Sequence, residues 1–261
     1  MIKIENTEVI GWEHAIRGMR NPMNSWAGSD SGYCGGDNHI GCVHCHFAGD
    51  KEHNEKMIAT DFTYGYGVLP CGKKEFTGEY EIGHKDYELM KKLCKAGTDH
   101  RKFMRMITIY VDVTAPLYWW KEYDTYKVGT VANSCSTMHK IGEKEFTLDD
   151  FSYEHLIDTC LLEGIINTLN TYRNIYNNYD KQPDVYKAEF SKKDIWWQII
   201  QLLPSSYNQR RTLMLNYEVL ANIYKSRRGH KLDEWKTFCE WIDTLPYSEL
   251  ITDKINGDDN D

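Results

Sequence analysis

Hydrophobic and polar residues alternate most clearly between residues 107 and 114. Ile107, Ile109, Val111 and Val113 are separated by polar or aromatic residues, and this period of two with β-branched side chains predicts a half-buried strand. Ala115-Pro116 should end that strand, since proline has no N–H to donate. A short helix is expected from Leu117 to Tyr126, and a strand followed by a short helix between Thr7 and Met19.

Helical periodicity predicts five further helices, at about 85–96, 152–178, 192–203, 210–228 and 231–244. The helix at 152–178 should bury the stripe Ile157, Leu161, Gly164, Thr168, Tyr172 and Tyr176. The helix at 210–228 should bury Leu213, Tyr217, Leu220 and Tyr224. Gly97, Pro204, Gly229 and Pro246 stand where helices are expected to have stopped.

Residues 27–83 differ from the rest of the chain. They are rich in Gly, Asp, Asn, Cys and His and show little periodicity, which predicts loops and short hairpins. The acidic end at 255–261 is expected to be disordered. Since no repeat or linker interrupts the pattern, we expect one α+β domain over residues 1–261, with 27–83 as a loop-rich insertion.

Composition narrows the classes of function. The net charge of −8 argues against a polymeric nucleic acid partner, which needs a basic surface, although a local basic pocket for one nucleotide remains compatible with it. No apolar run reaches the roughly 20 residues that span a bilayer, and the start of the chain does not resemble a signal peptide. We therefore expect a cytoplasmic protein whose eight cysteines form no disulfide frame.

Cysteines and histidines cluster within the insertion. Cys42 and Cys45 have zinc-ligand spacing, and Cys34 and His46 can complete a tetrahedral site, with His39 as another candidate. A polar loop with free thiols fits the same residues. The pattern also matches haem c attachment, which normally requires export.

Two polar segments carry candidate ligands for a nucleotide. Asn216 and Arg227 are eleven residues apart, about three helical turns, and so share a face if one helix holds both. Such a pair can bind a base edge or a phosphate, but a solvated helix face explains it equally. The second segment, between Trp119 and His139, offers short hydroxyls and an amide, which are phosphate ligands as well as turn formers.

Taken in order, these segments resemble the flavin-dependent thymidylate synthases over roughly residues 84–245. In that family an Arg-His-Arg motif comes nine residues after a strand-ending Ala-Pro; here Thr125-Tyr126-Lys127 follows Ala115-Pro116 at that distance. Asn133-Ser134-Cys135-Ser136 is similar to the family's Asn-Glu-x-Ser segment, with one residue inserted before it. Leu203-Pro204 is followed at the family's spacing by Asn216, Asn222 and Arg227.

The resemblance implies a largely antiparallel sheet flanked by helices, a homotetramer with sites between subunits, and a small-molecule nucleotide substrate. It implies methylation of deoxyuridine monophosphate (dUMP) at the base, with FAD as cofactor and with NADPH and methylenetetrahydrofolate as co-substrates. Arg227 and Asn222 would be catalytic, and Asn216, Asn222, Thr125, Tyr126 and Lys127 would bind the flavin. The nucleotide would be bound by Asn133, Ser134, Ser136 and Arg227, and by Arg210, Arg211 and Arg20 in place of missing arginines.

The departures from the family motif leave alternatives open. Only Lys127 keeps a cation where the family has Arg-His-Arg, and Glu218 replaces the arginine of Asn-Ala-Arg. A related enzyme with changed chemistry, such as hydroxymethylation, and a nucleotide-binding homologue without catalysis are the two alternatives. Cys135 is either a nucleophile toward the pyrimidine or a small residue packed in a turn.

Overall fold

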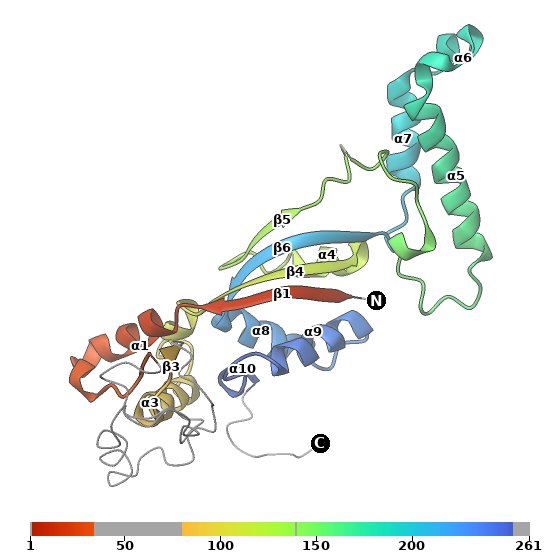
Figure 1. Cartoon of the computed structure of the whole chain (residues 1–261). Coiled ribbons are helices and arrows are strands. Elements are labelled where there is room, and N and C mark those ends of the chain that lie inside the picture. Colours follow the sequence, from red (N-terminus) through yellow and green to blue (C-terminus); the bar gives the residue numbers. More distant parts are fainter. Residues whose placement is uncertain (1, 34–79, 139, 253–261) are drawn as a thin grey trace, which may run out of the picture. The chain divides into compact units, whose positions relative to one another are not determined.

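The computed structural model describes residues 2–33, 80–138 and 140–252 (Figure 1). The fold is of mixed helix and strand, with a central antiparallel sheet flanked by helices. The fold class expected from the sequence is therefore confirmed. None of the described helices is long and apolar enough to cross a bilayer.

The central sheet has four strands in the order β1-β4-β6-β5. The strands are β1 (Lys3–Ile10), β4 (Thr108–Pro116), β6 (Asn208–Asn216) and β5 (Val131–Ser134). β5 pairs antiparallel with β6, with Val131 opposite Met214 and Ser134 opposite Arg211. The alternation predicted for β4 is confirmed, since Ile109, Val111 and Val113 are all buried.

The chain divides into two compact units, and strands β1, β4 and β6 each have residues in both. One unit comprises Met1–Glu8, Tyr110–Met214 and Ser226–Trp241, and the other comprises Val9–Ile109, Leu215–Lys225 and Ile242–Asp261. The expectation of one domain over the whole chain stays a prediction.

The first unit contains α4 (Leu117–Tyr123), α5 (Cys160–Asn177), α6 (Asp184–Glu189), α7 (Lys192–Leu202) and most of α9 (Asp233–Asp243). Its core joins α4 to α9 through fully buried aromatic rings: Trp119, Trp120 and Tyr123 from α4, and Trp235 and Phe238 from α9. The indole of Trp120 donates to the Gln209 carbonyl at 2.9 Å, which ties α4 to β6.

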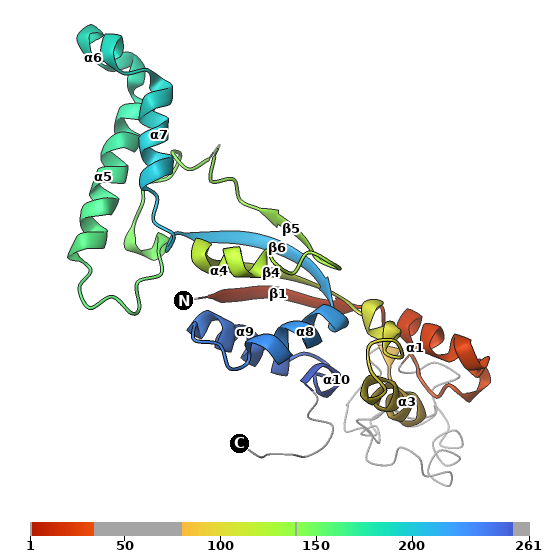
Figure 2. The ribbon, with the colours of Figure 1, turned by 180° about the vertical axis from the view of Figure 1, so that it is seen from behind.

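A second core in this unit holds a helical hairpin. Helices α5 and α7 lie side by side (Figures 1 and 2), and Leu162, Ile166, Leu169 and Ile199 pack there with Phe146 and Phe151. The expected helix at 152–178 therefore begins only at Cys160. Its predicted apolar stripe is wrong at Ile157, Leu161, Gly164 and Thr168, which are all exposed, whereas Tyr172 and Tyr176 do pack against the core. The buried face begins one residue later, at Leu162.

The second unit contains α1 (Trp12–Arg20), α3 (His84–Lys95), most of α8 (Tyr217–Arg227) and α10 (Glu249–Thr252), with the short ribbon β2 (Gly32–Tyr33) and β3 (Tyr80–Glu81). Short 3-10 turns occur at Asn21–Met23, Trp26–Gly28 and Lys102–Arg105 in this unit, and at Leu148–Asp150 and Tyr179–Lys181 in the first. Of the predicted insertion 27–83, residues 34–79 lie outside the described residues, as does the tail at 255–261.

The predicted helix at 210–228 is wrong in its first part. Residues up to Asn216 form β6, and the helix α8 begins at Tyr217. In β6 the buried side chains are Gln209, Leu213 and Leu215, whereas Arg210 and Thr212 are exposed, which is the period of a strand. Asn216 and Arg227 therefore do not lie on one helix.

Candidate functional site

Arg227, the last residue of α8, brings two distant parts of the chain together. Its Nε donates to the hydroxyl of Tyr126 at 3.0 Å, although 101 residues separate the two in sequence. Its Nη1 donates to Oε2 of Glu122, on α4, at 2.7 Å. The guanidinium also lies over the ring of Trp235, 4.8 Å from the centroid. These contacts fix the plane of the guanidinium, while Nη2 has no partner among the described residues.

Glu122 is the centre of this arrangement. Besides Arg227, its Oε2 accepts a hydrogen bond from Trp235 Nε1 at 2.9 Å, and His230 Nε2 lies 3.4 Å away. The carboxylate therefore neutralises part of the charge of Arg227 and holds its orientation. A guanidinium held in this way can present its remaining N–H groups to a planar acceptor, such as the carbonyl edge of a base.

Tyr126 and Lys127 line an open pocket between α4 and β5. Its volume is about 290 Å³, and its other lining residues are Tyr123, Asp124, Thr130 and Ala132. The hydroxyls of Thr125 and Thr130 bond to the carbonyls of Glu122 and Tyr126 and so stabilise the turn after α4. Lys127 forms no ion pair with any described residue, so its charge is uncompensated there.

The predicted nucleotide ligands from β5 and β6 lie on paired strands, because Asn133 stands opposite Thr212 and Ser134 opposite Arg211. Arg211 Nη1 contacts Asp124 at 2.7 Å and its guanidinium lies over the Trp120 ring. Arg210 Nη2 contacts Asp112 at 2.7 Å. Both arginine charges are thus already paired.

Ser136 and Cys135 follow β5. The Ser136 hydroxyl accepts a hydrogen bond from the amide of Met138 at 3.2 Å. The Cys135 amide donates to the Arg210 carbonyl, and its thiol is exposed. The role of Cys135, as a nucleophile or as a small residue in a turn, stays a prediction.

Asn216 and Asn222 belong to the second unit. The Asn216 side chain accepts a hydrogen bond from the Val219 amide at 3.0 Å and so stabilises the start of α8. Asn222 has an exposed side chain on that helix. Glu218, where the family has arginine, is buried and forms an ion pair at 2.9 Å with Arg101.

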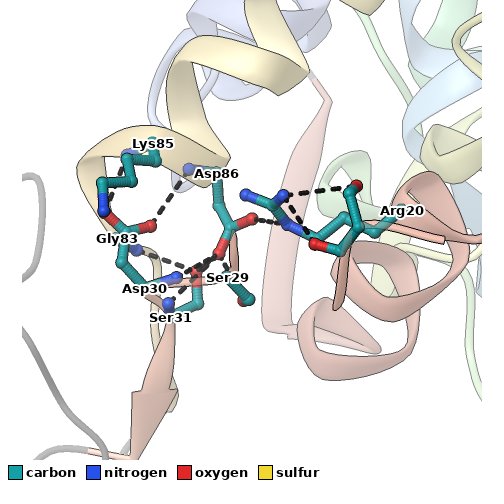
Figure 3. A network of polar contacts seen from close by, with 8 residues as sticks. Arg20, Ser29, Asp30, Ser31, Gly83, Lys85 and Asp86 are labelled. Carbon is teal, nitrogen blue, oxygen red and sulfur yellow. Dashed lines mark hydrogen bonds and ion pairs between the residues drawn. The ribbon is translucent and has the colours of Figure 1, made fainter. Parts of the chain in front are cut away.

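Arg20 lies in a buried polar network of the second unit (Figure 3). Its Nε contacts Asp86 Oδ1 at 2.5 Å, and Nη1 donates to the carbonyl of Ser25. Asp86 also accepts hydrogen bonds from the Ser29 and Ser31 hydroxyls and from two backbone amides. Burial opposes the ionisation of Asp86, but the bonds from Ser29, Ser31 and Arg20 outweigh it and keep its pKa below the ordinary value. This network gives Arg20 a structural role.

The candidate zinc ligands Cys34, Cys42, Cys45 and His46 lie outside the described residues. Among the described residues there is no group of His, Cys, Asp and Glu side chains that would hold a metal ion. The zinc site stays a prediction.

Sequence reasoning missed three residues that the structure places beside Arg227: Glu122, His230 and Trp235. Glu122 falls in the helix predicted from Leu117 to Tyr126, and Trp235 in the helix predicted at about 231–244. Their shared hydrogen bonds connect α4 to residues more than 100 positions later, so no local pattern marks them.

Comparison with known proteins gives a result at the level of the fold. No protein-family model matches the chain, and no curated protein matches it. A crystal structure of Thymidylate Synthase X (ThyX) from Helicobacter pylori with FAD and dUMP matches with a TM-score of 0.58 and 12% identity, covering 98% of this chain and 100% of that one. A second ThyX structure from H. pylori, also complexed with FAD and dUMP, matches with a TM-score of 0.58 and 11% identity, over 96% and 97% of the two chains. The chain therefore has the fold of the flavin-dependent thymidylate synthases.

Proposed function

We propose that this protein binds FAD and dUMP and methylates the base, with methylenetetrahydrofolate as the one-carbon donor and NADPH as the reductant. The observation that carries the proposal is the hydrogen bond from Arg227 to Tyr126. It joins two of the segments in which the sequence resembles the family, and the similarity of fold covers 98% of the chain. A homotetramer in the cytoplasm is part of the same proposal.

Arg227 would bind the pyrimidine. Its Nη2 can donate to a carbonyl oxygen of the base and stabilise negative charge that develops on the ring. Glu122, Tyr126 and Trp235 hold the guanidinium in place before the ligand arrives, so little side-chain entropy is lost on binding. The bound flavin would supply the hydride, while the protein supplies placement and electrostatics.

The flavin would be contacted by Tyr126 and Lys127, which line the pocket. The assignment of Asn216 and Asn222 to the flavin rests on motif spacing alone. The residues present fit such a group in one respect, because Lys127 offers a cation with no competing partner among the described side chains. Thr125 has its hydroxyl engaged with the Glu122 carbonyl, so it would support the turn and contact the cofactor only through other atoms.

The nucleotide phosphate would lie near Asn133, Ser134 and Ser136. The arginine that the family has at position 218 is a glutamate here, and its charge is taken up by Arg101. Arg210 and Arg211 already pair with Asp112 and Asp124, so they could offer a phosphate only the N–H groups that those carboxylates leave free. This loss of free cations favours a second candidate, a homologue of the same fold that binds a nucleotide without catalysis. An enzyme with another base modification, such as hydroxymethylation, is the alternative favoured by Thr125-Tyr126-Lys127 in place of Arg-His-Arg.

The test begins with reconstitution. Purified protein is mixed with FAD and desalted, and its absorbance is recorded between 300 and 550 nm; dUMP is then titrated by calorimetry. Replacing Arg227 with alanine should weaken dUMP binding by about 10–100-fold, the range for a hydrogen bond to a charged group, while FAD remains bound. Arg228→Ala is the matched control, because Arg228 is adjacent and exposed.

The outcomes separate the candidates. Equal effects of Arg227→Ala and Arg228→Ala, or no flavin retained at saturating FAD, would contradict the proposal. Mass spectrometry of the nucleotide after turnover distinguishes a methyl from a hydroxymethyl product. Binding of dUMP without turnover would indicate the non-catalytic homologue. Growth of a thymidine-requiring strain tests the methylation reaction in cells.

A further inference from the structure

His230 lies in the short segment between α8 and α9, beside the contacts that hold Arg227. Its backbone amide donates to the carbonyl of Arg227 at 2.9 Å. Its ring packs edge-on against Trp235, with 6.4 Å between the ring centroids, and the side chain is only 24% exposed. The imidazole is therefore held against α9, while its main chain is tied to the end of α8.

The backbone amide of Leu232 fixes which nitrogen of this ring carries the proton. It donates to Nδ1 of His230 at 3.2 Å. A backbone N–H can only donate a hydrogen bond, so Nδ1 is the acceptor and carries no proton. Since a neutral imidazole has one N–H, that N–H is on Nε2.

The Nε2–H group of His230 lies against the carboxylate of Glu122. The distance from Nε2 to Oε2 is 3.4 Å, longer than an ordinary hydrogen bond. The same oxygen accepts hydrogen bonds from Arg227 Nη1 at 2.7 Å and from Trp235 Nε1 at 2.9 Å. Donors from α8, from α9 and from the segment between them thus converge on one oxygen atom of α4, which limits where that carboxylate can lie.

The charge on His230 decides how much of the Glu122 charge acts on Arg227. In its neutral form His230 adds a donor without adding a cation, and α9 contributes only the uncharged indole of Trp235. A second proton, at Nδ1, would break the bond from Leu232 and make His230 a competitor of Arg227 for Oε2. The neighbouring charged side chains are exposed or engaged elsewhere: Arg228 and Lys231 are exposed, Asp233 pairs with Lys236 and His155, and Glu234 bonds to Tyr118.

We propose that His230 is a positioning residue for Arg227: its neutral Nε2–H form holds Glu122 in the place from which the carboxylate orients the guanidinium. The inference deepens the proposed function and rests on it for the identity of the ligand. His230 itself contacts neither nucleotide nor flavin in this assignment. Because a protonated His230 competes for Glu122, the affinity for dUMP should fall at acid pH.

Two substitutions separate the roles of the two ring nitrogens. Asparagine places an amide oxygen where Nδ1 lies, so His230→Asn keeps the acceptor for Leu232 and loses the donor toward Glu122. Glutamine places an amide nitrogen where Nε2 lies, so His230→Gln keeps the donor and loses the acceptor. The same two substitutions at His155 are the controls, because that histidine is 79% exposed and also lies beside a carboxylate, 3.0 Å from Asp233.

Calorimetry at about pH 8, where histidine is neutral, should show dUMP binding weakened about 3–10-fold in His230→Asn, the range of a net hydrogen bond. His230→Gln and both controls should bind dUMP like the wild type. Melting temperatures should rank the two variants in the opposite order, because only His230→Gln loses the bond from Leu232. On lowering the pH to about 5.5, the wild type should lose more dUMP affinity than His230→Gln, since glutamine does not titrate and the phosphate of dUMP titrates equally in both.

The indole N–H resonance of Trp235, assigned with Trp235→Phe in a proton–nitrogen correlation spectrum, reports the contact with Glu122 without any ligand. It should move further in His230→Asn than in His230→Gln. Affinity for dUMP that is lost in His230→Gln and kept in His230→Asn, or that changes equally in both or in neither, would overturn the assignment and leave the proposed function intact. If the wild type binds no dUMP, the proposed function fails separately, and equal indole shifts in the two variants would still overturn the positioning role.

Discussion

The buried ion pair between Arg20 and Asp86 allows a stability prediction to be worked from the structure (Figure 3). The Asp86 side chain is fully buried, and its carboxylate accepts hydrogen bonds from Arg20, from two serine hydroxyls and from two backbone amides. Arg20 is itself only 7% exposed. Replacing Asp86 with asparagine keeps the size of the side chain but leaves the guanidinium without its counter-charge.

The expected loss is about 3–5 kcal/mol, the range for breaking one partner of a buried ion pair. For a chain of this size that corresponds to a fall in melting temperature of roughly 6–20 °C. Urea unfolding followed by circular dichroism gives the free energy of unfolding directly. Asp184→Asn is the control, since that carboxylate is 98% exposed and, within the described part of the chain, its one ion pair is with Lys187; the change should alter stability by less than about 0.5 kcal/mol.

Two results would refute this reasoning. One is a loss below about 1 kcal/mol in Asp86→Asn, which would mean that the network is solvated or replaceable. The other is a double variant, Arg20→Met with Asp86→Asn, that is no more stable than the single Asp86→Asn variant. Removing both charges eliminates the unpaired guanidinium, so the double variant should recover part of the loss.

Unchanged nucleotide affinity in Arg20→Ala would also remove Arg20 from the predicted substrate ligands.

Three further predictions concern single residues. Asn216→Ala should cost about 1 kcal/mol in urea unfolding because it removes the cap on the Val219 amide, whereas Asn216→Asp should keep the cap. Trp119→Ala should cost about 3–5 kcal/mol in the same assay, since the indole is fully buried among aromatic rings. Hydrogen bonds, chiefly from Thr212, hold the pKa of Asp112 well below its ordinary value. The stability that Asp112 contributes is therefore present at neutral pH and lost as the pH falls below about 4, so that urea midpoints measured from pH 7 to pH 3 should fall less steeply in Asp112→Asn.

Part of the fold could be predicted because a strand or helix that buries one face repeats its apolar residues at a fixed spacing. Strand β4 is half-buried, so its apolar residues recur every second position, and α3, α7 and α9 bury regular helical faces. Strand β6 was misassigned because Leu213, Tyr217, Leu220 and Tyr224 keep helical spacing across a junction from strand to helix. Pairing with β5 makes the first part a strand, and that pairing is a contact between segments far apart in sequence.

For the candidate site, too, the sequence predicted individual residues, whereas the structure showed which of them are in contact. The sequence by itself predicted the strand before α4 and most of the helices, because periodicity is a local property of the chain. Motif spacing likewise marked Arg227, Tyr126 and Lys127 as candidate ligands. Only the tertiary structure decided that Arg227 contacts Tyr126 and Glu122, and that the buried Tyr123 hydroxyl has no hydrogen-bond partner among the described residues. Hydrogen bonds and burial across about one hundred residues depend on how α4 and α9 pack, and that packing leaves no periodic trace in either segment.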